Sequence, residues 1–399
     1  MLRMKQAVLV ALAAALARQA IANEGSRKES KQPFEIVRSI EAIQDQIVLG
    51  NASAKSKLPA ILDQLAARLL AADSTVWRDA KNVRAGIVYV LSGGQARILR
   101  KAIESGTAPA AEMEFMRGAL AYVEGNQAEA KKLLLKIGPG ELPPLAGGHL
   151  ALVQSALLAK EDPVRALKLL GQARILAPGT LIEETALRRS VVLAADIGDV
   201  ETLEAVSREY QWRFPKSVYF ESFRERLAAA AVGFGLAIEP GKFAKIDQLA
   251  SVSDSVGQLR IYLQIAQRAI IGGKPRIARL AAERGLALSA EGSASRARSK
   301  LYEAAALILT DGLEAGLEQL NAPEMALLGK EDAELKDAVI ALAAAIRPAL
   351  GEAQGPAPPQ QAETGEPRPR TTGESASAEA LISFARDKLA QTDALLRRN

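Results

Sequence analysis

Turn-forming residues interrupt this chain at nearly constant intervals, and this repeat limits the possible folds more than any other feature of the sequence. Successive breaks lie 36 to 39 residues apart and centre on Gly125, Asp162, Gly198, Gly235, Gly272 and Asp311. Between them apolar residues recur with helical spacing, and the alternation typical of β-strands is almost absent. A period of about 34–40 residues is typical of solenoids built from helical hairpins. We therefore expect an all-α solenoid in which each break is the turn inside one hairpin.

The clearest repeat unit is PVRALKLLGQARILAP, residues 163–178, which resembles the second helix of a tetratricopeptide repeat. Ala166, Leu170 and Ala173 fall on one helical face, where small alanines let neighbouring helices approach closely. Proline cannot continue a helix, and prolines close the expected second helices at Pro139, Pro178 and Pro215. These features predict a tetratricopeptide-like helical repeat domain over residues 33–350.

The N-terminal segment has the three-part pattern of a secretory signal. Two cations within the first five residues precede an apolar run over residues 7–16, and a small-x-small site follows at residues 20–22. A short buried helix or a membrane anchor is the alternative, but the apolar run is too short to span a bilayer. We expect residues 1–22 to be a signal peptide, residues 23–32 to be a flexible segment, and the mature protein to reside in the periplasm.

The C-terminal part changes composition after residue 350. Residues 351–377 are rich in Pro, Gly and Glu and cannot bury a core, so we expect a disordered linker there. Residues 378–399 place apolar side chains roughly on one stripe, which predicts an amphipathic terminal helix. That helix could dock back on the solenoid, bind a partner or remain frayed.

Composition excludes several classes of function. The chain has no cysteine, which excludes thiol catalysis, cysteine-ligated zinc and disulfides. Its one histidine, His149, follows LAGG at an expected helix start, and we interpret it as a surface or capping residue. Without residues 1–22 the chain has 48 basic and 46 acidic residues, so its charge gives no support for nucleic-acid binding. We expect no cofactor and no bound metal.

The segment ARILAPGTLIEETALRRS, residues 173–190, places two acids beside two arginines, as an active site can. It also has the pattern of an ordinary helix start. Thr180 and Glu183 fit the S/T-x-x-E capping box, in which each side chain accepts from the backbone N–H of the other. Glu184 and Arg188 have the spacing of a helical ion pair. We therefore expect these charges to be structural, with Arg189 alone lacking an evident use within the helix.

A second segment, FPKSVYFESFRERLA, contains Glu221 and Ser222 flanked by aromatic residues. It resembles the Glu-Ser motif of lytic transglycosylases, which use one carboxylic acid in an apolar pocket. No compact lysozyme-like domain follows it. The alternative is a helix whose Tyr219, Phe220 and Phe223 enter the core while Glu221 stays solvated. We expect Glu221 to have no catalytic role.

Three segments together resemble the MotC family of periplasmic flagellar motility proteins of alphaproteobacteria. They are PFEIVRSIEAIQDQIVLGNASA from Pro33, VWRDAKNVRAGIVYVLSGG from Val76, and ARILAPGTLIEETALRRS leading on to YQWRFPKSVYFESF. The resemblance implies a non-enzymatic motor accessory protein that binds the periplasmic part of the stator subunit MotB and supports torque generation. A peptidoglycan-active enzyme of transglycosylase type and a general periplasmic helical-repeat scaffold remain the alternatives.

Aromatic and arginine side chains are the usual anchors of protein interfaces, and they concentrate where the resemblance is densest. The candidate partner-binding residues are Arg189, Tyr210, Trp212, Arg213 and Tyr219. The alternative is that the rings fill the core between repeats. Because Trp212 and Arg213 point about 100° apart on a helix, we do not expect both to be buried.

Overall fold

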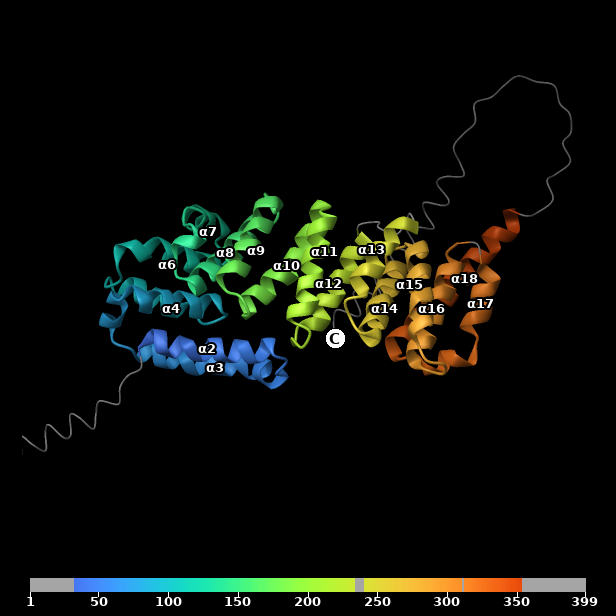
Figure 1. Cartoon of the computed structure of the whole chain (residues 1–399), viewed down its shortest axis with the longest axis horizontal. Coiled ribbons are helices and arrows are strands. Elements are labelled where there is room, and N and C mark those ends of the chain that lie inside the picture. Colours follow the sequence, from blue (N-terminus) through green and yellow to red (C-terminus); the bar gives the residue numbers. More distant parts are fainter. Residues whose placement is uncertain (1–31, 234–239, 311, 354–399) are drawn as a thin grey trace, which may run out of the picture. The chain divides into compact units, whose positions relative to one another are not determined.

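The computed structural model describes residues 32–233, 240–310 and 312–353, and within these ranges the chain forms helices and turns without a β-strand (Figure 1). The expected signal peptide, nearly all of the expected linker and the expected terminal helix lie outside the described residues. None of the described helices is long and apolar enough to cross a membrane. The chain divides into two compact units, and the first consists of the residues up to Arg189 together with Lys216–Val218.

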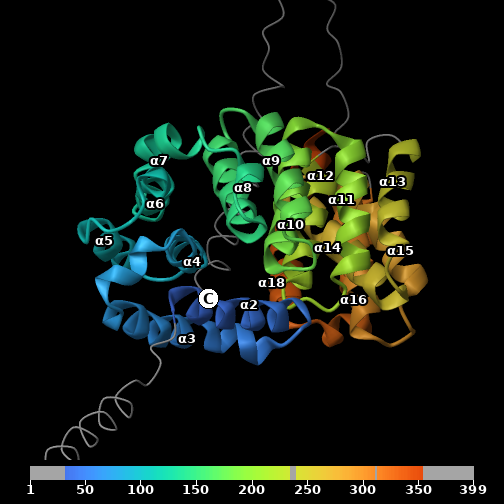
Figure 2. The same cartoon turned by 60° about the vertical axis from the view of Figure 1, so that its left-hand side comes forward.

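The first unit is a series of helical hairpins. Its elements are α2 (Pro33–Val48), α3 (Ala52–Ala71), the 3₁₀ helix η1 (Ser74–Arg78), α4 (Ala80–Leu91), α5 (Arg97–Glu104), α6 (Ala110–Val123), α7 (Gln127–Leu134), η2 (Pro139–Glu141), α8 (Pro144–Leu158), α9 (Pro163–Leu176) and the first half of α10 (Leu181–Ile197). Helix α2 packs on α3 and α4, α6 on α7, and α8 on α9 (Figure 2).

The second unit continues in the same manner. It contains the rest of α10, then α11 (Val200–Arg213), α12 (Phe220–Gly233), α13 (Pro240–Ala250), α14 (Ser255–Ile271), α15 (Pro275–Leu288), α16 (Ala294–Ile308), α17 (Leu313–Leu320), η3 (Pro323–Leu327) and α18 (Lys330–Ala353). The helices α12, α14, α16 and α18 stack in sequence, and α15 and α17 pack as second helices of their hairpins. The expected all-α helical-hairpin solenoid is confirmed, and α18 extends three residues past the expected end at residue 350.

The turn residues lie where the repeat predicts them. Gly125 follows α6, Gly198 follows α10 and Gly272 caps α14. Asp162 precedes α9, and its carboxylate accepts from the backbone N–H of Arg165 at 2.9 Å. Such caps satisfy donors that a helix start leaves unpaired. The residues at the two remaining predicted breaks, 235 and 311, lie outside the described residues.

Small residues set the spacing between the helices of the first unit. Ala166 and Ala173 of α9 are completely buried, as the tetratricopeptide-like pattern predicts. On α8, a Cβ atom added at Gly147 would lie 2.2 Å from the carbonyl oxygen of Pro139 in η2. Because no side chain fits at that distance, glycine is required for η2 to pack on α8.

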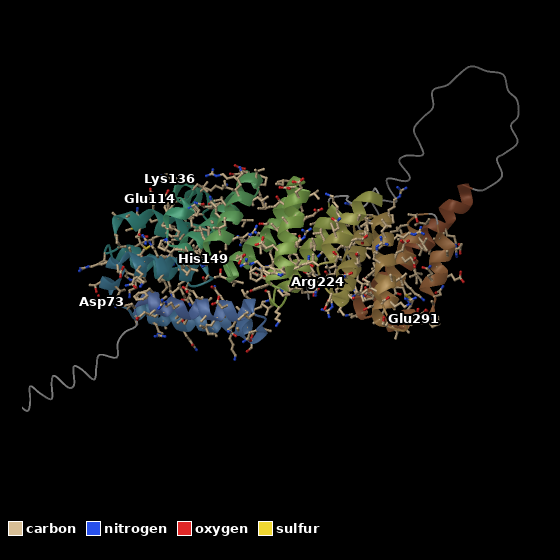
Figure 3. The ribbon with its side chains drawn as sticks, viewed as in Figure 1. Asp73, Glu114, Lys136, His149, Arg224 and Glu291 are labelled. Atoms are coloured by element: carbon tan, nitrogen blue, oxygen red, sulfur yellow. The ribbon has the colours of Figure 1, made fainter. Side chains whose placement is uncertain are left out.

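His149 is buried, and the interpretation of this residue as a surface or capping group is wrong. Helix α8 already begins at Pro144, and twelve of its fifteen residues are buried, so no solvent-facing side is left for the imidazole (Figure 3). Burial lowers the pKa of His149 to about 4 from 6.5, because the charged form loses its hydration. The Nε2 atom has no hydrogen-bond partner among the described residues. His149 is therefore a neutral core residue near pH 7.

The buried imidazole predicts a specific acid lability. Between pH 6.5 and about 4 the unfolded chain binds a proton at His149 that the folded chain does not bind. Stability from this group is thus fully present above pH 6.5 and is lost as the pH falls, by about 3 kcal/mol in all. Urea unfolding at about pH 7 and about pH 4.5 should show a smaller loss for His149→Gln than for the wild type. Equal losses for the two proteins would contradict a neutral buried His149.

The turn between α2 and α3 contacts a segment far along the chain. The backbone N–H of Val218 donates to the carbonyl oxygen of Ile47 at 3.4 Å. Gly50 has φ +100°, and a Cβ atom there would lie 2.5 Å from the carbonyl oxygen of Lys216. Position 50 therefore requires glycine for two reasons: the backbone is left-handed there, and the carbonyl oxygen of Lys216 leaves no space for a Cβ atom.

This contact predicts that Gly50→Ala is destabilising. The left-handed backbone costs roughly 1 kcal/mol for any side chain, and the clash with Lys216 should raise the total to about 2–3 kcal/mol. Gly106→Ala is the matched control, because Gly106 has φ +64° and no atom within 4 Å of an added Cβ. Chemical denaturation of both variants measures the difference. An equal loss of unfolding free energy in the two variants would show that the contact with Lys216 adds nothing to the cost of the substitution at Gly50.

Candidate partner-binding surface

The paired charges at the start of α10 are structural. The carboxylate of Glu183 accepts from the backbone N–H of Gly179, and the hydroxyl of Thr180 accepts from the backbone N–H of Ile182 at 3.2 Å. The helix start is thus capped from both sides, but each bond lies one residue before the N–H that the capping box predicted. Both acids occupy the first turn, where the helix dipole favours negative charge.

Glu184 joins α10 to the segment 216–218. Its carboxylate is completely buried and accepts from the Arg188 Nε–H at 3.0 Å, as the i,i+4 spacing predicts. Its second oxygen accepts from the Ser217 hydroxyl at 3.1 Å. A buried carboxylate whose two oxygens both accept hydrogen bonds has the arrangement of a structural group.

The predicted partner-binding residues separate into exposed and buried ones. Trp212 is 76% exposed at the C-terminal end of α11, and the adjacent Arg213 is exposed as well. Tyr219 is half-buried. Arg189, in the first unit, is exposed but donates from Nη1 to the carbonyl oxygen of Leu152 at 3.1 Å, so it has a structural use that the sequence did not indicate.

Tyr210 is a core residue. Its ring stacks on Phe223 with a centroid distance of 4.0 Å and an interplanar angle of 13°. Phe214 and Phe220 complete this cluster, with ring centroids 5.8 and 5.9 Å from that of Tyr210. The alternative that rings fill the core is thus correct for Tyr210, which is not accessible to a partner. Of the five candidates, Trp212 presents the largest apolar area to solvent.

Glu221 does not have the environment of a catalytic acid. Its side chain is 52% exposed, and its carboxylate contacts the guanidinium of Arg224 and accepts from the Gln264 amide. A general acid of this type lies in an apolar pocket, whereas the Glu221 carboxylate is half-exposed and lies against a guanidinium and an amide. The described residues also contain no cluster of His, Asp and Glu that could hold a metal ion.

The contact with Arg224 predicts a modest structural role for Glu221. Arg224 is only 6% exposed, so Glu221→Gln removes the negative charge beside a buried cation. We expect a loss of about 1 kcal/mol, because the half-exposed carboxylate is partly screened by solvent. Glu225→Gln, on an exposed side of the same helix, should change stability by less than about 0.5 kcal/mol. Thermal unfolding compares the two, and murein degradation by the wild type that Glu221→Gln abolishes would restore the transglycosylase interpretation.

Comparison with known proteins identifies the family to which this chain belongs. The family described as "Chemotaxis protein MotC" matches residues 1–399. A chemotaxis protein MotC of Rhizobium meliloti (strain 1021) is 33% identical over 353 residues, which are 88% of this chain and 81% of that protein. This chain therefore belongs to the MotC family of chemotaxis proteins.

Proposed function

We propose that this chain is a non-enzymatic accessory protein of the flagellar motor, that it acts in the periplasm, and that it binds the periplasmic part of the stator subunit MotB. Binding would support torque generation and hence motility. Membership of the MotC family supports a role in motility. The signal-like residues 1–22 support the periplasmic location. Helical-hairpin solenoids commonly act by presenting extended surfaces to other proteins.

The exposure of Trp212 is the observation that carries the binding proposal. Aromatic residues form 4% of this chain, and the Trp212 side chain is 76% exposed beside the exposed Arg213. Exposed tryptophan contributes nothing to the core, whereas Trp and Arg are the residues that dominate binding energy when a partner covers them. We therefore assign Trp212 and Arg213, with Tyr219 as a half-buried neighbour in sequence, to the stator-binding surface. Arg189 remains a separate candidate contact on the first unit.

A matched pair of variants tests this assignment. Ile175 is 81% exposed and lies three residues before Pro178, as Trp212 lies three residues before Pro215. Calorimetric titration with the purified periplasmic part of MotB should show at least about tenfold weaker binding for Trp212→Ala, since anchor residues contribute about 2 kcal/mol or more. Ile175→Ala should bind within about twofold of the wild type. Both should keep the wild-type melting temperature, because neither side chain is packed.

Arg213→Glu and swimming assays extend the test to the cell. The charge reversal should weaken binding and reduce swimming while flagella still assemble. Tyr210→Ala should instead lower the melting temperature, because its ring is in the core. Wild-type affinity in both Trp212→Ala and Arg213→Glu would reject this surface. Normal swimming in a strain that lacks the whole protein would reject the motor function itself.

A further inference from the structure

Helix α14 and the first half of α15 carry no acidic residue. Residues 255–282 contain Arg260, Arg268, Lys274, Arg276 and Arg279 and neither Asp nor Glu. The neighbouring acids pair with bases elsewhere, as Asp247 does with Arg284 at 3.1 Å and Asp332 with Arg298 at 2.7 Å. Asp254 caps the start of α14 and Arg279 pairs with Glu283 at 3.2 Å, whereas the two arginines of α14, Arg260 and Arg268, have no ion pair within the described residues.

Two arginines of α14 extend into solvent without a counter-ion. Arg260 and Arg268 are exposed, and no carboxylate within the described residues lies within ion-pair distance of either. Val256 precedes Arg260 by one helical turn and is 59% exposed. With Gln264, these residues follow one another at intervals of four and form a stripe along α14, which we call the α14 stripe: Val256, Arg260, Gln264 and Arg268.

A buried cation lies beside this stripe. Helix α12 packs on α14, and its Arg224 is almost completely buried, with no hydrogen-bond partner for its Nε–H among the described residues (Figures 1 and 3). Burial lowers the pKa of Arg224, the positive charge of Arg260 lowers this pKa further, and the negative charge of Asp254 opposes both by raising it. One half-exposed carboxylate, that of Glu221, contacts Arg224 and also accepts from the Gln264 amide. The Gln264 Oε1 atom is buried and has no donor. Glu221 therefore pairs with Arg224, while the neighbouring Arg260 has no ion pair among the described residues.

We propose that the α14 stripe is a docking surface for an acidic segment of a partner polypeptide. One carboxylate of the segment would bind Arg260 beside Arg224, and a second would bind Arg268. A rise of 1.5 Å per residue puts these positions about 12 Å apart along α14, which matches acids three to four residues apart in an extended chain. The exposed Val256 favours a polypeptide over a polyphosphate, because it offers an apolar contact one helical turn before the first of the two arginines. This surface does not depend on the proposed stator-binding surface of α11.

A peptide probe tests the proposal on the full-length mature protein. The probe is a fluorescent peptide with glutamates at every fourth position and leucines between them, and binding is measured by anisotropy at low salt. Replacing both arginines, in Arg260→Gln with Arg268→Gln, should weaken binding at least about fivefold, as for two partly exposed ion pairs. The matched control is Arg100→Gln with Arg347→Gln, which removes the same charge from two exposed arginines already paired with Glu124 and Glu314. This control should bind within about twofold of the wild type.

Val256→Ser separates a docking surface from diffuse attraction. It should weaken the peptide about two- to threefold without changing the salt dependence, because it removes apolar contact and no charge. Equal weakening by the two double variants would overturn the proposal, since net charge alone would then explain binding. Absence of peptide binding by the wild type would overturn it too, and so would binding to phosphatidylglycerol vesicles that displaces the peptide. Circular dichroism confirms that each variant is folded.

Discussion

The close approach of helix backbones at alanine and glycine is the constraint on which the rest of this structure depends. Ala166 and Ala173 are completely buried, and a Cβ at Gly147 or Gly316 would lie within 2.7 Å of a carbonyl oxygen on a neighbouring element. With no disulfide and few aromatic rings, stability comes from area buried between closely packed helices. A larger side chain at these positions would push two neighbouring elements apart. Because each repeat of a solenoid packs on the next, the packing of the following repeat would be disturbed as well.

Much of the fold could be predicted, because it depends on local residue types that can be read directly from the sequence. Glycine, proline and aspartate at regular intervals define where helices stop and start, so the hairpins could be predicted. The burial of His149 could not be predicted, because the LAGG segment before it suggested a helix start, where a side chain is often exposed. The role of the two glycines in that segment is to let η2 and Ala177, which follows the last residue of α9, pack closely against α8, and this is a tertiary contact. The hydrogen bonds at the start of α10 also differ from the prediction. Either of two adjacent backbone N–H groups can donate to a capping side chain, and the backbone conformation determines which one does.

The candidate surfaces could be predicted only in part from the sequence. Leu203, Val206 and Tyr210 follow one another at helical spacing, so their common buried side on α11 was readable, and Trp212 then had to point away from it. The acid-free stretch around α14 was also visible in the sequence. The burial of Arg224 was not, because it depends on how α12 packs against α14. The sequence thus indicates which residues a helix exposes. Whether a buried side chain has hydrogen-bond partners can be known only from the residues that lie next to it in space.

The return of Lys216–Val218 to the first unit has a consequence for how the protein is made. A chain leaving the ribosome has completed α2 to α9 long before it reaches residue 216, yet the carbonyl of Ile47 must wait for Val218, and the Glu184 carboxylate made next must wait for the Ser217 hydroxyl. The first unit is finished only after α11, which belongs to the second, has been synthesised. The two units therefore cannot mature strictly one after the other, and a protein cut after Arg189 would lack part of its own first unit.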